Sequence, residues 1–125
     1  LYFEHCTSCH GANGKGVKVP GTDQYLAPSL VDSQRVHGDP EKLIPLFFHG
    51  IMGPIEGKNF SAGYMAPAKV FGIEREDRLA ELISYIRYAW GKRGNCVEKD
   101  LVYQIKRKHQ NRTSPWTDEE LKSLK

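Results

Sequence analysis

The 125-residue sequence lacks a long hydrophobic run, since apolar stretches such as residues 43–48 are far shorter than the roughly 20 residues of a membrane-spanning helix. We therefore expect no transmembrane segment in this chain. Only three cysteines are present, which excludes a disulfide-dense scaffold. The sequence also has neither an internal repeat nor a low-complexity tract, and its length suits one domain with a small appendage.

The formal net charge of +3 is unevenly spread along the chain. Residues 92–125 carry nine Lys or Arg against five Asp or Glu, whereas residues 1–91 carry nine against ten. The cations of the basic tail alternate with acidic and apolar residues on expected helices. We interpret them as a solvated helix face and expect no nucleic-acid partner.

One cysteine pair forms a motif with a specific chemistry. Cys6-Thr7-Ser8-Cys9-His10 reads C-x-x-C-H, the signal for covalent attachment of haem c. Two thiols three positions apart lie about one helical turn from each other, so that each can add to one haem vinyl group. His10 then lies under the iron and can supply a neutral imidazole nitrogen.

Two other classes of site use the same residue types. A thioredoxin-like redox pair follows a strand inside a βαβ unit, and no strand-like run precedes Cys6. A zinc site needs a second ligand pair, whereas Cys96 stands alone and His37, His49 and His109 form no pair at ligand spacing. Haem attachment is therefore the interpretation that we prefer.

A proline follows the motif at the end of a glycine-rich loop. The carbonyl of Pro28 can accept the second ring N–H of His10, a bond that sets the tautomer of a ligand histidine. A plain loop proline explains the residue equally well, so both interpretations stay open at this point.

The central part of the chain predicts a broken helix and a small hairpin. A helix over 40–49 begins after Asp39, a capping residue, and is bent or shortened by Pro45. The turn-rich residues 54–63 indicate a β-hairpin, with Ile55 and Phe60 directed inward.

Two further helices follow. Apolar residues at helical spacing predict a helix over 76–90, with Arg78, Glu81 and Arg87 facing water. A second amphipathic helix is expected over 99–109, and Thr117 with Glu120 forms a capping box for a last helical turn. We expect the tail to dock on the core through four apolar residues, Val102, Ile105, Trp116 and Leu121.

A haem iron held by His10 has a sixth position, for which four residues are candidates. Met65 is preferred because it lies in an irregular loop made rigid by Pro67, whereas Met52 is explained by packing. His37, His49 or an open site remains the alternative. A histidine–methionine pair makes an electron carrier, and an open site permits ligand binding or oxygen chemistry. The apolar side chains expected around the Met65 sulfur are Ile55, Phe60, Tyr64 and Val70.

With these motifs in the same order, residues 1–90 resemble class I cytochromes c. The resemblance implies an all-α fold around one haem c, thioethers at Cys6 and Cys9, axial ligands His10 and Met65, and a Pro28 carbonyl that accepts from His10. It also implies that Tyr85 packs on the helix that carries Tyr2 and Phe3. The matching segments are Cys6-Thr7-Ser8-Cys9-His10-Gly11, Pro28-Ser29-Leu30, His49-Gly50-Ile51-Met52-Gly53-Pro54-Ile55, Met65-Ala66-Pro67 and the helix over 79–90.

The segments 85–91 and 112–117 are similar to those of monohaem domains joined to periplasmic quinoprotein-type dehydrogenases. This narrower resemblance implies an electron carrier rather than an enzyme, which relays electrons from a dehydrogenase to a cytochrome or terminal oxidase. It also implies a periplasmic location in a bacterium, with any membrane association supplied by a larger protein. A haem-based enzyme or sensor with an open sixth site is the alternative, with His49 as its distal residue.

The sequence departs from this pattern in three places. The helix before the motif is reduced to a stub, so we expect a processed or excised piece with a truncated N-terminal helix. Met-Pro is replaced by Met65-Ala66-Pro67, and Cys96 is an extra cysteine. We expect a cytochrome domain over 1–91 and a helical extension over 92–125.

Overall fold

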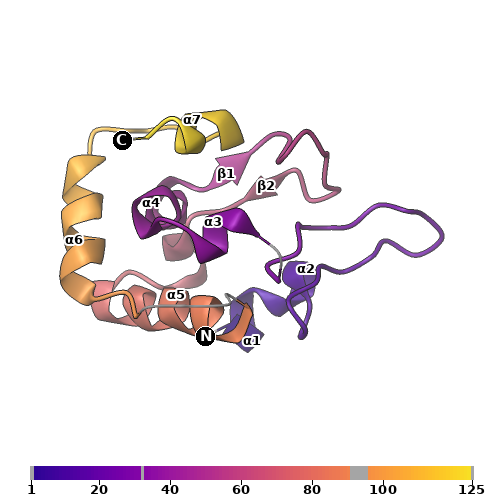
Figure 1. Ribbon diagram of the computed structural model, residues 1–125, viewed down its shortest axis with the longest axis horizontal. Coiled ribbons are helices and arrows are strands. Elements are labelled where there is room, and N and C mark those ends of the chain that lie inside the picture. The colour runs from indigo at the N-terminus through magenta and orange to yellow at the C-terminus, as the bar shows by residue number, and fades with distance from the viewer. Residues whose placement is uncertain (1, 32, 91–95, 125) are drawn as a thin grey trace.

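The computed structural model describes residues 2–31, 33–90 and 96–124, so the expected domain boundary at 91/92 lies outside the described residues. Helices dominate, with one two-stranded antiparallel sheet, which confirms the all-α class with a small hairpin (Figure 1). No helix in these three ranges is long and apolar enough to cross a membrane. The elements are α1 (Tyr2–His5), α2 (Thr7–His10), α3 (Gln34–His37), η1 (Pro40–Lys42), α4 (Ile44–His49), β1 (Ile51–Met52), β2 (Tyr64–Met65), η2 (Ala68–Phe71), α5 (Glu76–Trp90), α6 (Lys99–Lys108) and α7 (Asp118–Lys122).

Helix α5 has the predicted bounds and supplies one side of the core. It lies along one edge of the molecule, and α6 runs from it toward α7 on the opposite edge (Figure 1). Its apolar residues recur at 3.6-residue spacing, so they form one buried stripe. The buried residues of this stripe are Leu79, Ala80, Leu82, Ile83 and Ile86.

The prediction that Arg87 faces water is wrong. Its side chain is only 4% exposed, and its Nη1 donates to the carbonyl oxygens of Val36 at 3.1 Å and Gly38 at 2.8 Å. These carbonyls lie at the C-terminal end of α3, where helix backbone acceptors lack an intrahelical partner. Arg87 therefore ties α5 to α3, a role that helical periodicity cannot reveal.

The expected helix over 40–49 is divided into two pieces. Asp39 accepts a hydrogen bond from the Glu41 amide at 2.9 Å and begins the 3₁₀ turn η1. Helix α4 then begins anew with Pro45 in its first turn, where a missing amide proton costs nothing. Pro45 thus shortens the helix, as predicted.

The two strands of the hairpin lie just outside the predicted range of 54–63. β1 and β2 pair antiparallel, with Ile51 opposite Met65 and Met52 opposite Tyr64. Met65 is therefore on a strand and not in the irregular loop that the sequence suggested. Gly50 precedes β1 at φ +77°, and a side chain there would collide with the carbonyl oxygen of Met65.

The N-terminal segment packs on the end of α5 through aromatic rings. The ring of Tyr2 lies 4.6 Å from that of Trp90 and 6.0 Å from that of Tyr85, and its hydroxyl donates to the Gly11 carbonyl at 2.6 Å. A Cβ on Gly14 would lie 2.5 Å from the Trp90 ring, so only glycine permits this close approach. Helices α1 and α2 are thereby fixed against α5.

Residues 96–124 pack against the rest of the chain. Val102 and Ile105 of α6 and Leu121 of α7 are buried in the same cluster as the α5 stripe. Trp116 pairs with β1, because its amide donates to the Gly50 carbonyl and its carbonyl accepts from the Met52 amide, both at 2.9 Å. The capping box of Thr117 and Glu120 is present and confirms the sequence prediction.

Trp116 is also enclosed by polar groups. The Arg112 guanidinium lies 3.7 Å over its ring, and the rings of His109 and His49 meet it edge-on at 5.0 Å and 6.4 Å. Trp116 is 4% exposed, and its backbone pairing attaches the tail to β1.

We expect Trp116→Ala to lower the free energy of unfolding by about 3–5 kcal/mol, because a large buried side chain is lost and its cavity is only partly refilled. Tyr103→Ala on α6 is the matched control, since Tyr103 is half-exposed and its loss should cost only about 0.5 kcal/mol. Urea titration followed by circular dichroism measures both. Equal losses in the two variants would contradict tail docking through Trp116.

Candidate functional site

One cavity of about 270 Å³ lies between the N-terminal helices, the loop before α3, α4 and the hairpin. Its wall is mainly apolar, as is typical of a site for an organic cofactor. Segments far apart in the sequence, from Tyr2 to Ile86, contribute to it. The lining residues that enter the discussion below are His5, Cys6, Cys9, His10, Pro28, Ser33, Arg35, Ile51, Ile55, Phe60, Tyr64, Met65 and Phe71.

Cys6, between α1 and α2, and Cys9, on α2, both line this cavity. The amide of His10 donates to the Cys6 carbonyl at 2.9 Å, which holds the motif in helical conformation and keeps the two thiols about one turn apart. Burial raises the pKa of the Cys6 thiol to about 11. Neither cysteine forms a disulfide with another described residue.

The ring of His10 is fixed by Pro28. Its Nδ1 lies 3.0 Å from the Pro28 carbonyl oxygen, which can only accept, so Nδ1 carries the proton and Nε2 keeps its lone pair. Burial lowers the pKa of His10, and the Pro28 carbonyl opposes this shift. The pocket wall thus presents a neutral imidazole with one nitrogen ready to bind a metal.

The two methionines differ in position. Met65 on β2 is half-buried and lines the cavity together with its strand partner Ile51. Met52 follows Ile51 on β1, but it does not line the cavity and is 47% exposed. The interpretation of Met52 as a packing residue is therefore wrong.

Three of the four apolar residues expected around the Met65 sulfur line the cavity. Ile55, Phe60 and Tyr64 line the cavity, but Val70 is 63% exposed and does not, because it lies on the outer side of η2. Of the histidines weighed as ligands, His37 and His49 are both absent from the cavity wall, and the His37 Nε2 lies 3.0 Å from the Val31 carbonyl oxygen.

Two basic residues of the cavity wall, His5 and Arg35, are absent from the sequence-based expectations. His5 lines the cavity beside Cys6, with its ring 5.7 Å from that of Phe71. Arg35 on α3 also lines it, and no local pattern in the sequence distinguishes this arginine from a surface one. No group of three or more His, Cys, Asp or Glu side chains within the described ranges is placed to hold a metal ion.

Comparison with known proteins agrees with this geometry. Residues 1–90 match the family described as Cytochrome c. The chain belongs to the cytochrome c family. Two relatives, both described as cytochrome c-552, come from Thermus thermophilus. Each is 29% identical over 89 residues, or 71% of this chain, and the match spans 65% and 57% of the relatives' lengths, less than two-thirds.

Cytochromes c bind haem c covalently, and the residues of this pocket fit that group. The donor set comprises two thiols one turn apart, an imidazole nitrogen with a free lone pair and a thioether, and the surrounding wall is apolar. The resemblance to class I cytochromes c is therefore confirmed.

The number of thioether bonds between the protein and haem can be measured by alkylating the cysteine thiols that remain free. In the denatured holoprotein only Cys96, which is exposed and free, should react with iodoacetamide, giving one added label by mass spectrometry. The variant Cys96→Ser should take none, whereas the apoprotein should take three. Two labels on the holoprotein would mean that one thioether is missing.

Proposed function

We propose that this cytochrome c domain carries electrons through one haem c that is bonded to Cys6 and Cys9 and ligated by His10 and Met65. The observation that carries the proposal is that the unprotonated Nε2 of His10 and the thioether of Met65 belong to the same apolar cavity as the two thiols. Haem supplies an iron that exchanges one electron between its ferrous and ferric states.

The chain's own residues would adjust that exchange. A methionine sulfur is a soft ligand, which favours the ferrous state and raises the reduction potential. Ile55 and Phe60 beside it keep water away, and a dry surrounding disfavours the additional ferric charge. The Pro28 carbonyl holds the His10 ring in the tautomer that can bind iron.

Electron exchange also needs close approach of a redox partner. Cys6 and Cys9 are only half-buried, and Phe71 at the same cavity is 39% exposed, so this side supports an accessible haem edge. The proposed partners are a dehydrogenase donor and a cytochrome or terminal oxidase acceptor. Support for the donor class comes from the likeness of segments 85–91 and 112–117 to dehydrogenase-linked domains.

The ligand assignment is tested by Met65→Ala, with Met52→Ala as the matched control. Axial ligands spread haem potentials over roughly 0.8 V, so the loss of a Met65 ligand should lower the potential clearly. It should also remove the sulfur-to-ferric-iron absorption band and let carbon monoxide bind rapidly. Met52→Ala should change none of these properties, because its side chain points to solvent.

Two results would contradict the assignment. Reversed behaviour of the two variants would make Met52 the ligand. Avid carbon monoxide binding by the unaltered protein would indicate a five-coordinate haem and favour the enzyme or sensor alternative.

We also propose an extracytoplasmic, periplasmic location, because thioether attachment by dedicated machinery takes place on the outer side of the energy-conserving membrane. Cytosolic expression without that machinery should yield apoprotein, and export with it should yield holoprotein. Pyridine haemochrome spectra measure both. Full covalent haem in the cytosolic product would refute this reasoning.

A further inference from the structure

Arg35 is the one Lys or Arg side chain that reaches the cavity wall among the described residues. Its side chain is 13% exposed, and the neighbouring wall is apolar. A cation in such a place is costly unless an anion compensates it. The buried guanidinium of Arg35 therefore requires an anionic partner, and no acidic residue close to α3 in the sequence pairs with it among the described residues.

The partner comes from the other end of the chain. Asp118, the first residue of α7, forms an ion pair with the Nη2 of Arg35 although 83 positions separate the two residues. Its side chain is 7% exposed, and its second oxygen accepts from the Glu56 amide at 3.0 Å. Lys122 lies 3.2 Å from that oxygen, so hairpin, α3 and tail meet at this carboxylate.

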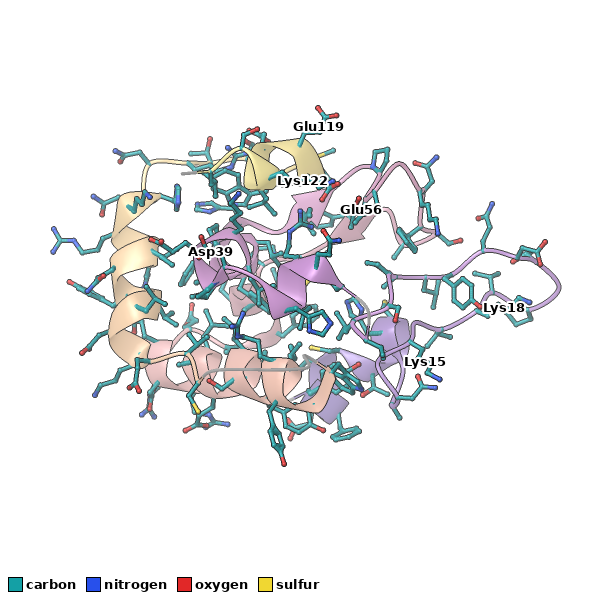
Figure 2. All side chains as sticks on the ribbon, viewed as in Figure 1. Lys15, Lys18, Asp39, Glu56, Glu119 and Lys122 are labelled. Atoms are coloured by element: carbon teal, nitrogen blue, oxygen red, sulfur yellow. The ribbon has the colours of Figure 1, made fainter. Side chains whose placement is uncertain are left out.

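The formal charges of the four groups at this site sum to zero. Lys122 also pairs with Glu56 at 3.1 Å, and Figure 2 shows these two side chains side by side. Arg35 and Lys122 contribute two positive charges, and Asp118 and Glu56 two negative ones. Although burial opposes it, hydrogen bonds from the Glu56 amide and Arg35 hold the pKa of Asp118 below its usual value.

Asp118 engages only part of the guanidinium. Within the described part of the chain, the Nε and Nη1 of Arg35 have no hydrogen-bond partner, while Nη2 is bonded to Asp118. A guanidinium can bind two anions at once through its five N–H groups. Haem brings two carboxylates on its periphery, so the remaining donors match the anions that the cofactor carries.

We propose that Asp118 is a positioning residue, which holds Arg35 at the haem pocket so that the C-terminal extension helps to set the reduction potential. The inference rests on haem occupying this cavity, as the proposed function requires. The tail then has an electrostatic role at the redox centre besides its packing role around Trp116.

The test compares Asp118→Asn with Glu120→Gln in the holoprotein. Both variants remove one negative charge from α7, and Glu120 also pairs with an arginine, Arg112, at 2.8 Å, but neither of these two residues lines the cavity. Asp118→Asn leaves an uncompensated positive charge at the pocket, which favours ferrous iron. The ratio of reduced to oxidised protein at a fixed potential should rise about threefold, or about 30 mV for a one-electron couple.

Salt dependence and two further variants complete the test. In Asp118→Asn, the change in the ratio of reduced to oxidised protein should persist at about 0.5 M salt, because the site is buried. In Glu120→Gln, the ratio should change little at low salt and even less at high salt. Arg35→Gln should change the ratio of reduced to oxidised protein in the opposite direction. This variant tests the proposal if Asp118→Asn does not accumulate as folded protein. In the double variant Asp118→Asn/Arg35→Gln, the ratio of reduced to oxidised protein should remain lower than in the unaltered protein. The reason is that the N–H donors of the Arg35 guanidinium are lost.

The proposal is overturned if Asp118→Asn lowers the thermal midpoint but leaves the potential at the Glu120→Gln value, since the carboxylate would then be only structural. An unchanged potential in Arg35→Gln would overturn it as well. In both cases an intact sulfur-to-iron band would show that the proposed ligation by Met65 stands independently.

Discussion

The hydrogen bond from the His10 ring to the Pro28 carbonyl determines what the pocket can bind, because it decides which ring nitrogen carries the proton. Backbone bonds of the intervening loop hold the two residues together. The His10 carbonyl accepts from the Gly16 amide at 2.7 Å, and the Leu30 amide donates to the Gly14 carbonyl at 2.6 Å. Gly14 in turn rests on Trp90, so the orientation of one imidazole depends on the packing of α5.

Local chemistry made much of this fold predictable. The helix over 76–90, the amphipathic α6 and the capping box of α7 are each specified by residues within a few turns of one another. Tertiary contacts account for the errors. Arg87 is buried because its guanidinium donates to backbone carbonyls at the end of α3. Met65 is on a strand because it pairs with Ile51. Neither partner is near in sequence.

Some residues of the candidate site can likewise be identified from the sequence, whereas others cannot. The C-x-x-C-H motif is contiguous, so its chemistry can be inferred from the residues alone. The preference for Met65 over Met52 rests on a loop character that the structure does not show. The two residues differ instead in position, since Met65 lines the cavity whereas Met52 does not and is 47% exposed. The Arg35–Asp118 pair joins residues 83 positions apart and leaves no trace in local spacing.

The pairing of Trp116 with β1 has a consequence for association between chains. A short strand with an open edge offers amide and carbonyl groups that another chain can pair with, which is a common route to aggregation. Here one edge of β1 is occupied by β2 and the other by the backbone of Trp116. The extension therefore shields the strand from intermolecular β-sheet growth, and a chain cut before Trp116 would expose it.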